Sequence, residues 1–401
     1  MTVGNTPTYW FGLDDTDERE YGCTTHDFDS LVRYLTSAGY IVEDPRLVRL
    51  WPFAPTRTRG NAALAAAVST HDYIGLESAM NEWFSNRFAD IMPSDAAHSA
   101  QPVLLLSECK LPESMYWDTV QSFVELSDRI QELEGHSHRY WSTSAGLGGL
   151  IGASAAIAWQ GNEDCTWECT VWRNKQSGPR IVPEKIVIEM AEKFPSTFLN
   201  RDPNAERTLI APRTPCPVLY GIRGESKQGV LDAHEFLQNN GAEISSGHRV
   251  HRSNQATDDH LIGSDSGSIQ QIRVRQGGHV EIDVGKTLLA FSEGGDLNQL
   301  AQNLEPGDSI EWWGLTNTDD SVHLERLRLI RGERNRSRPI CKCGTRYKSQ
   351  GRGQSLKCPK CSSIHQNVWC FDIDSSDWKE PPPSHRRHLS KPLSRMGNPE
   401  V

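Results

Sequence analysis

Three carboxylates crowd into four residues near the start of the chain, at Asp14, Asp15 and Asp17. They follow residues 9–13, a mostly apolar run that predicts a buried strand. Clustered Asp side chains at the end of a strand suit Mg²⁺, which prefers oxygen ligands and completes its shell with substrate phosphates. The same residues could instead form a solvated acidic turn in which Asp17 or Thr16 caps a helix.

The loop that follows these carboxylates has residue types that can handle phosphate. It contains Gly22 and the hydroxyls of Thr24 and Thr25. Backbone N–H groups of such a loop can bind a phosphate, and a hydroxyl can accept a phosphoryl group. A second stretch, Arg57, Arg59, Gly60 and Asn61, suits a triphosphate or a nucleic-acid backbone, although an exposed basic turn would have the same composition.

Four cysteines have the spacing of a structural zinc ribbon. Cys341 and Cys343 are followed, after fourteen residues, by Cys358 and Cys361. Two cysteine pairs that bracket a short hairpin predict a Zn²⁺ site, and four unligated thiols are the alternative. Because the first pair is C-x-C, a tight spacing, Cys370 is a possible substitute for Cys341.

Basic residues gather in the C-terminal quarter although the whole chain carries a formal net charge of −10. Ten Lys or Arg and one acid lie between residues 331 and 366, and residues 384–395 contain no acid. Local basic patches of this kind bind nucleic-acid phosphates. The predicted RNA-binding residues are Arg346, Lys348, Arg386, Arg387 and Lys391. Three prolines, residues 381–383, precede the tail, which we expect to stay extended until RNA orders it.

Length and composition indicate an intracellular protein of several domains. The chain has 401 residues, of which 37% are hydrophobic and 23% charged, and two to four domains are expected. No apolar run is long enough for a membrane span, and the first residues lack the features of a secretory signal. Ten cysteines, four of them with metal-ligand spacing, favour a reduced, cytoplasmic setting.

Alternating strands and helices must position these residues. The apolar periodicity predicts helices over residues 26–40, 71–88 and 115–133 and strands over residues 46–51 and 103–106. That alternation indicates an α/β layer structure. Residues 243–330 contain short alternating runs separated by Gly and Pro turns, a pattern that predicts a small β-barrel.

Seven stretches and the cysteine cluster, in this order along the chain, resemble one known family. The stretches are residues 12–17, 22–25, 46–50, 58–63, 149–153, 217–225 and 252–258. They resemble the archaeal tRNA(Ile) 2-agmatinylcytidine synthetase family, TiaS, over nearly the whole chain. One departure is the C-x-C pair, where the family normally has C-x-x-C.

The resemblance implies a multidomain fold of α/β and α+β type. It implies a kinase-like α/β domain at residues 1–134, a ferredoxin-like domain at 135–242 and an OB-fold at 243–335. A zinc ribbon at residues 336–370 and a basic tail at 371–401 complete the expected order. Residues 62–68 are expected to form a strand because the family has one there, in spite of their helical propensity.

The resemblance also implies a reaction. ATP, converted to AMP, would activate the 2-oxo group of the wobble cytidine in the CAU anticodon of isoleucine tRNA as a phosphate ester, and agmatine would then displace phosphate. Asp14, Asp15 and Asp17 would hold Mg²⁺, and Thr24 matches the family's autophosphorylated threonine. Asp164 and Gly152 are our candidates for the agmatine site; Asp164 and Glu168 could also be ordinary charges at a strand edge.

Two other functions fit parts of the sequence. One is a non-catalytic RNA-binding protein built from an OB-fold and a zinc ribbon. That function leaves the acidic cluster and residues 57–61 without a role. The other is a Mg²⁺-dependent nucleotide hydrolase in which the C-terminal half tethers RNA.

Overall fold

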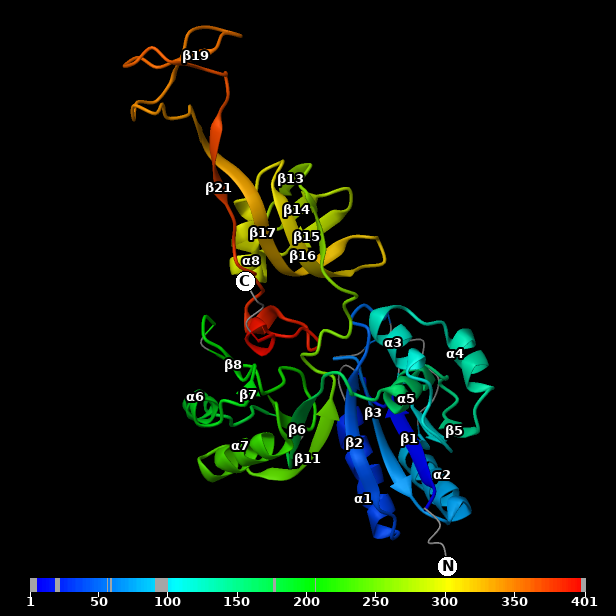
Figure 1. The fold of residues 1–401 in the computed structure, drawn as a ribbon. Helices are drawn as coiled ribbons and strands as arrows, with labels where there is room; N and C mark the ends of the chain where they lie inside the picture. The colour runs from blue at the N-terminus through cyan, green and yellow to red at the C-terminus, as the bar shows by residue number, and fades with distance from the viewer. Residues whose placement is uncertain are drawn as a thin grey trace, which may run out of the picture. The chain divides into compact units, whose positions relative to one another are not determined.

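The chain folds into two compact units. The computed structural model describes residues 6–18, 22–55, 57, 60–90, 100–175, 178–205 and 207–397. Met1–Ile262 and Pro383–Val401 form one unit, which we call the large unit, and Gly263–Pro382 forms the small unit. The chain therefore leaves the large unit, builds the small one and then returns (Figure 1).

A nine-stranded sheet organises the large unit, in the order β5-β4-β1-β3-β2-β11-β6-β10-β7. Its strands are β1 (Thr8–Asp14), β2 (Val42–Arg49), β3 (Ala62–Ser69), β4 (Val103–Ser107), β5 (His138–Ser142), β6 (Thr166–Arg173), β7 (Thr197–Phe198), β10 (Val218–Gly224) and β11 (Ser245–Ser253). All pairings are antiparallel except that of β2 with β11, which joins the two halves of the sheet. A separate two-stranded ladder pairs β8 (Arg201–Asp202) with β9 (Arg207–Thr208).

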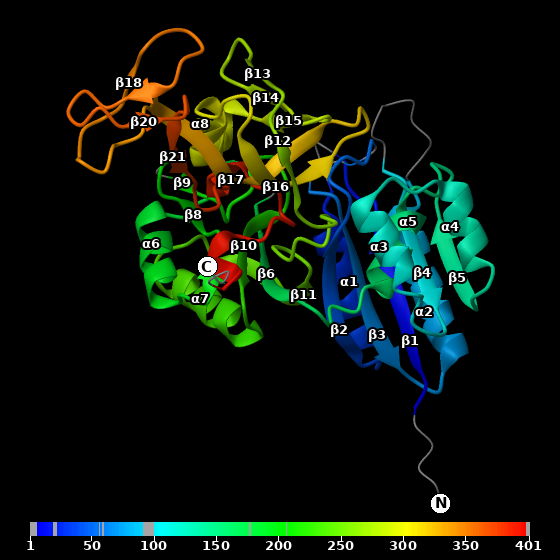
Figure 2. The same ribbon diagram turned by 45° about the horizontal axis from the view of Figure 1, so that its top comes forward.

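Helices cover both faces of this sheet (Figures 1 and 2). They are α1 (Thr24–Ser37), α2 (Tyr73–Phe88), α3 (Ser114–Gln121), α4 (Leu126–Leu133), α5 (Gly149–Ala158), α6 (Glu184–Lys193) and α7 (Lys227–Asn239). Successive residues of a strand face opposite sides, so β3 serves two cores. Ala63 and Ala65 pack in the core with α3 and α5, whereas Leu64 and Val68 pack in the core with α1 and α2.

Local sequence explains where several of these helices begin. The Asp72 side chain accepts a hydrogen bond from the Gly75 N–H at 2.9 Å and caps α2. The Ser226 hydroxyl does the same for α7, with the Gly229 N–H as donor at 3.1 Å. Helices α6 and α7 then close a third core over β6, β10 and β11.

The small unit is built on a half-barrel sheet. Its strand order is β12-β16-β17-β15-β14-β13, and β21 pairs with β17. These strands are β12 (Asp265–Ser268), β13 (Gln271–Val274), β14 (Val280–Asp283), β15 (Thr287–Ala290), β16 (Ser309–Thr316), β17 (Val322–Ser337) and β21 (Cys370–Asp374). One short helix, α8 (Asp296–Gln302), packs on β14, β15 and β17.

A three-stranded ribbon completes the small unit. It consists of β18 (Lys348–Ser349), β19 (Leu356–Lys357) and β20 (Ile364–His365). The ribbon lies in the chain between β17 and β21, which pair with each other antiparallel. The first part of the long strand β17 pairs within the half-barrel, and its last part pairs with β21 next to the ribbon.

The structure confirms most expected elements and corrects two. The strand over residues 62–68 and the helix ending at residue 88 are present as β3 and α2. The single helix expected over residues 115–133 is wrong, because extended backbone at Ser122 separates α3 from α4. The expectation of an extended tail is also wrong: residues 383–397 pack on the large unit, with Leu389 buried in its core.

Two further observations concern the expected layout. Residues 245–253, which we grouped with the barrel, form β11 of the large unit's sheet. Among the described residues, no helix combines the length and apolar character that crossing a membrane requires.

Candidate active site and zinc centre

A cavity of about 360 Å³ opens in the large unit and is lined from both halves of the nine-stranded sheet. Most of the residues singled out near the N-terminus line it. These are Asp14, Asp15, Asp17, Thr24, Arg57, Gly60, Asn61 and Gly152. Arg59 lies outside the described residues. Gly22 belongs to the turn before α1 and is not part of the lining.

Carboxylates form one wall of the cavity, where β1 ends. Burial, together with the neighbouring charges of Asp15 and Asp17, raises the pKa of Asp14 well above its ordinary value. Burial also raises the pKa of Asp15 to about 7, although the Gln101 N–H donates to its carboxylate at 3.1 Å. Neither Asp14 nor Asp15 forms an ion pair with a described residue. Crowded, unpaired carboxylates with raised pKa values fit a divalent cation.

Helix α5 packs against this wall through Gly152. A Cβ atom on Gly152 would lie 1.9 Å from the Asp14 Oδ2 atom, so only glycine lets the helix approach the carboxylate. The Thr24 hydroxyl, at the start of α1, donates to the Asp17 Oδ1 atom at 3.1 Å. The predicted phosphoryl acceptor and a predicted metal ligand are therefore neighbours.

A second part of the lining, which we call the basic wall, is defined by Arg49, Glu168, Arg223 and His388. The Glu168 carboxylate lies 3.9 Å from Arg49 and 3.6 Å from Arg223, measured N to O. Burial alone would raise the pKa of Glu168, but the two guanidinium groups lower it below its ordinary value. Glu168 is therefore ionised, and the wall has two guanidinium groups for one carboxylate.

The stretch expected to bind phosphate lies beside this basic wall. The Gly60 carbonyl accepts a hydrogen bond from Arg49 Nη1 at 3.1 Å. The Asn61 side chain donates to the Trp51 carbonyl at 2.8 Å, and Asn61 adopts a positive φ of 43°. Arg57 is exposed at the rim, where it donates to the Ala54 carbonyl at 3.0 Å.

Asp164, our candidate for the agmatine site, does not line this cavity. Its carboxylate forms ion pairs with Lys391 at 2.8 Å and with Arg395 at 3.1 Å. Two cations thus already neutralise it. Glu168, the other acid weighed from the sequence, is in the cavity, but it also has two cationic partners.

Three cavity residues of the basic wall, Arg49, Arg223 and His388, were not singled out from the sequence. Arg49 and Arg223 fall in stretches that carried the family resemblance, yet neither received a role from the sequence. Their signal was the arginine within a short apolar strand, where a charged side chain needs a partner. His388 had no signal, because it lies 165 residues from the arginine it contacts.

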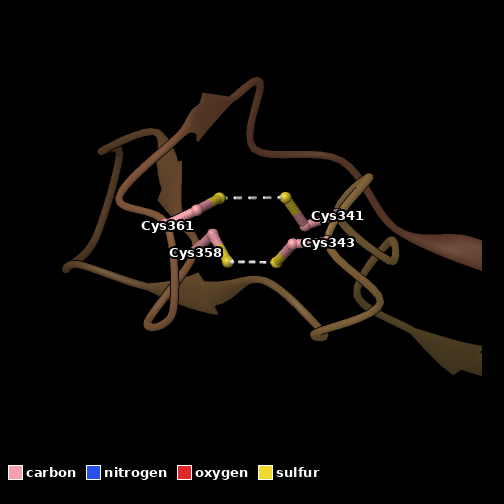
Figure 3. Close-up of side chains that lie close together, drawn as sticks. All are labelled: Cys341, Cys343, Cys358 and Cys361. Atoms are coloured by element: carbon pink, nitrogen blue, oxygen red, sulfur yellow. Dashed lines mark hydrogen bonds between the residues drawn. The ribbon is translucent and has the colours of Figure 1, made fainter.

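The four predicted zinc ligands come together in the ribbon (Figure 3). The sulfur atoms lie 3.4 Å apart in the Cys341–Cys361 and Cys343–Cys358 pairs, and all four lie within 4.8 Å of one another. That grouping fits one tetrahedral Zn²⁺ ion. The backbone N–H of Cys343 lowers the pKa of Cys341 to about 5, which favours the ligating thiolate. Cys370 lies outside the group, in β21, so the C-x-C pair supplies two ligands.

The predicted RNA-binding residues fall in two places. Arg346 and Lys348 are exposed on the ribbon. Arg386, Arg387 and Lys391 belong to the docked segment of the large unit, where the Arg387 guanidinium lies 5.0 Å from the ring centre of Phe53. RNA contact by these five side chains stays a prediction.

Fold and site together define a class: a multidomain α/β protein with a cavity suited to a metal and phosphate, and a half-barrel unit that carries a zinc ribbon. Three family models match the chain. They are the TiaS TCKD domain at residues 10–145, the TiaS FLD domain at residues 148–260 and the TiaS C-terminal zinc ribbon domain at residues 338–369.

Full-length relatives give the same family. The isoleucine-tRNA 2-agmatinylcytidine synthetase TiaS of Archaeoglobus fulgidus is 31% identical, over 96% of this chain and 97% of its own. That of Cenarchaeum symbiosum is 32% identical, over 96% and 92%. A crystal structure of TiaS in complex with its isoleucine tRNA and ATP matches with a TM-score of 0.77 and 29% identity over 97% of both chains. The chain belongs to the TiaS family.

Proposed function

We propose that the protein joins agmatine to C2 of the wobble cytidine in the CAU anticodon of isoleucine tRNA, with consumption of ATP. The observation that carries the proposal is the cavity that Asp14, Asp15, Asp17 and Thr24 line together with Arg49 and Arg223. Relatives over the full length of the chain carry this activity in their name, and related solved structures hold the isoleucine tRNA with ATP, or with AMPCPP and agmatine.

The reaction needs two bond exchanges at the cytidine and one hydrolysis. First, the cytidine O2 atom attacks the γ-phosphoryl group of ATP, so that a new P–O bond forms and ADP leaves. Water cleaves the remaining phosphoanhydride bond of ADP, which gives AMP and phosphate. The primary amine of agmatine then attacks C2. The C2–O bond breaks, phosphate leaves with the former oxygen, and the amine loses a proton. The product reads AUA instead of AUG because its altered base pairs with A.

The acidic wall supplies the metal chemistry of the first step. Asp14, Asp15 and Asp17 would hold Mg²⁺, and the bound ion neutralises phosphate charge and orients the transferred group. The raised pKa values of Asp14 and Asp15 support this role, because a cation would relieve the repulsion between these buried carboxylates. Thr24, beside Asp17, is the proposed site of autophosphorylation.

The basic wall stabilises negative charge in the same step. Arg49 and Arg223 offer guanidinium donors to phosphoryl oxygens, and Gly60 and Asn61 shape the adjoining loop. For agmatine, the proposed positions are Asp164 and Gly152. Gly152 lies at the acidic wall, whereas Asp164 would first have to exchange Lys391 or Arg395 for the guanidinium of agmatine.

The domain layout that we propose follows the family. Residues 1–134 would form a kinase-like domain, and the ferredoxin-like domain expected at 135–242 would extend through β11 to residue 262. The OB-fold expected at 243–335 would then begin at residue 263, followed by a zinc ribbon at 336–370 and a basic tail at 371–401, of which residues 371–382 belong to the small unit. OB-folds commonly bind single-stranded nucleic acid, so the small unit would hold tRNA while the large unit performs the chemistry. We also propose that the protein acts in the cytoplasm.

One assay tests the function and its alternatives. The protein is incubated with isoleucine tRNA of CAU anticodon, MgATP and agmatine, and the tRNA is digested and weighed by mass spectrometry. We expect the wobble nucleoside to gain the mass of agmatine less water. ATP cleavage with unmodified tRNA would instead indicate a nucleotide hydrolase. If neither ATP cleavage nor tRNA modification is observed, a non-catalytic RNA-binding protein is the function that remains. Omission of agmatine is the control.

A further inference from the structure

The segment that returns from the small unit is anchored tightly to the large unit. Leu389 is 1% exposed and belongs to the core under β1, β3 and β4. The His388 carbonyl accepts a hydrogen bond from the Ala256 N–H at 2.8 Å, and the Leu389 carbonyl accepts one from the Asp258 N–H at 2.9 Å. Residues 383–397 are therefore part of the folded large unit.

Ion pairs after the buried leucine and a hydrogen bond before it fix the same segment. Asp164 pairs with Lys391 and Arg395, and Glu225 pairs with Arg395 at 2.5 Å. The Asp202 carboxylate accepts a hydrogen bond from the Ser384 N–H at 3.2 Å. Such anchors on both sides restrict the residues between them, so the position of His388 is well determined.

His388 faces the cavity with one ring nitrogen already engaged. Its Nδ1 atom lies 3.0 Å from Arg223 Nη2, and since a guanidinium only donates, Nδ1 is the acceptor. His388 lines the cavity but is exposed to solvent, and the positive charges of Arg49 and Arg223 lower the pKa of His388 well below its ordinary value. The ring is therefore neutral, with its proton on Nε2.

The Nε2 atom lies beside the stretch expected to bind phosphate. A Cβ atom on Gly60 would lie 3.4 Å from His388 Nε2 and 2.2 Å from Arg49 Nη1, so the histidine, the arginine and this glycine meet in one part of the cavity. Among the described residues, none accepts a hydrogen bond from Nε2.

The neighbouring arginines, Arg49 and Arg223, also have N–H donors without a hydrogen-bond partner among the described residues. These donors are the buried Nε–H groups of both residues, although Arg223 Nε lies 3.6 Å from the Glu168 carboxylate. Two guanidinium groups against the single carboxylate of Glu168 leave this wall positive. A phosphoryl oxygen is the ligand that satisfies several N–H donors and this excess charge at once.

We propose that His388 is a substrate-binding residue whose Nε2–H donates a hydrogen bond to a phosphoryl oxygen of ATP, and that residues 383–397 deliver it to the cavity. The inference deepens the proposed function and rests on its use of ATP. A neutral donor suits this position, because it adds a hydrogen bond without a third positive charge beside Arg49 and Arg223.

The test compares variants of similar size in the full-length protein. The dissociation constant for MgATP, without tRNA, is measured by calorimetry for wild type, His388→Gln, His388→Asn and His388→Leu. A glutamine amide nitrogen can occupy the position of Nε2, whereas that of asparagine lies near Nδ1. We expect His388→Leu and His388→Asn to bind MgATP about ten- to a hundredfold more weakly, and His388→Gln within about threefold of wild type.

The control is His385→Ala, a histidine of the same segment that does not line the cavity, and this variant should bind MgATP as wild type does. Thermal unfolding confirms that each variant folds, and if His388→Leu does not, the Gln and Asn variants decide. Wild-type affinity in the Leu and Asn variants, or equal losses in Gln and Asn, would overturn the proposal, as would a wild type that does not bind MgATP. Failure of the proposed function appears separately, as tRNA that wild type leaves unmodified.

Discussion

The ribbon and the cavity both bring reactive side chains together, but over different lengths of chain. The four cysteines lie within twenty-one residues, on two short loops of one small ribbon. The cavity combines Asp14 with Glu168, Arg223 and His388, from opposite halves of a nine-stranded sheet and a returning segment. The ribbon site should therefore be separable from the rest of the protein, whereas the cavity should depend on the whole large unit.

The largest expected effect comes from the acidic wall. Asp15→Asn removes one ligand charge from the proposed Mg²⁺ site, and ATP turnover with tRNA and agmatine should fall by about two orders of magnitude or more. The fold should persist, because Asp15 has no described ion pair to lose. Turnover is measured as AMP release. Near-normal AMP release from a folded variant would remove Asp15 from the metal site.

Truncation tests whether the cavity depends on distant chain. Deleting residues 383–401 removes Leu389 from the core and His388 from the basic wall, so unfolding of the large unit should become easier by about 2 kcal/mol or more. MgATP affinity should fall with it, while zinc content should not change. Calorimetry and metal analysis measure these quantities. A truncated protein with intact MgATP binding would show that the returning segment is dispensable for the cavity.

The reverse experiment breaks the ribbon alone. Cys358→Ser removes a thiolate ligand, and zinc should fall from about one ion per chain to nearly none. MgATP binding by the large unit should persist, because no ribbon residue lines its cavity. Cys370→Ser is the matched control and should retain zinc, since Cys370 lies outside the cluster. Loss of MgATP binding in Cys358→Ser would contradict the separation of the two sites.

The smallest expected effect concerns the decrease in the free energy of unfolding at acidic pH. Burial lowers the pKa of His251 to about 4 in the folded chain, while the unfolded chain keeps an ordinary value near 6.5. Between those pH values only the unfolded state takes up the proton, so stability falls as pH falls from about 6.5 to 4. His251→Phe should reduce that fall by about 1–2 kcal/mol in denaturant titrations. If the His251→Phe variant loses as much stability between about pH 6.5 and 4 as wild type does, another group causes the loss. The control is His385→Phe, at an exposed histidine.

The separation along the chain between the residues of a site also decides what the sequence could predict. Cysteine spacing was enough for the ribbon ligands, and apolar periodicity was enough for β1, α1 and α2, because both signals are local. The strand β3 needed the family resemblance, since its alanines favour a helix. The break between α3 and α4 was missed, since Ser122 lies inside an otherwise helical pattern. The partners of Asp164 and the role of His388 depend on contacts across more than 160 residues, which no periodicity encodes.

The return of the chain to the large unit sets the order in which the site can exist during synthesis. A ribosome makes the acidic wall, Arg49 and Glu168 early and then the entire small unit before it reaches His388. A nascent chain stopped within residues 263–382 therefore has the carboxylates but an unfinished basic wall. If His388 binds ATP as proposed, chains that terminate before residue 388 bind ATP weakly, and the ATP site reaches full affinity only when translation has passed the small unit.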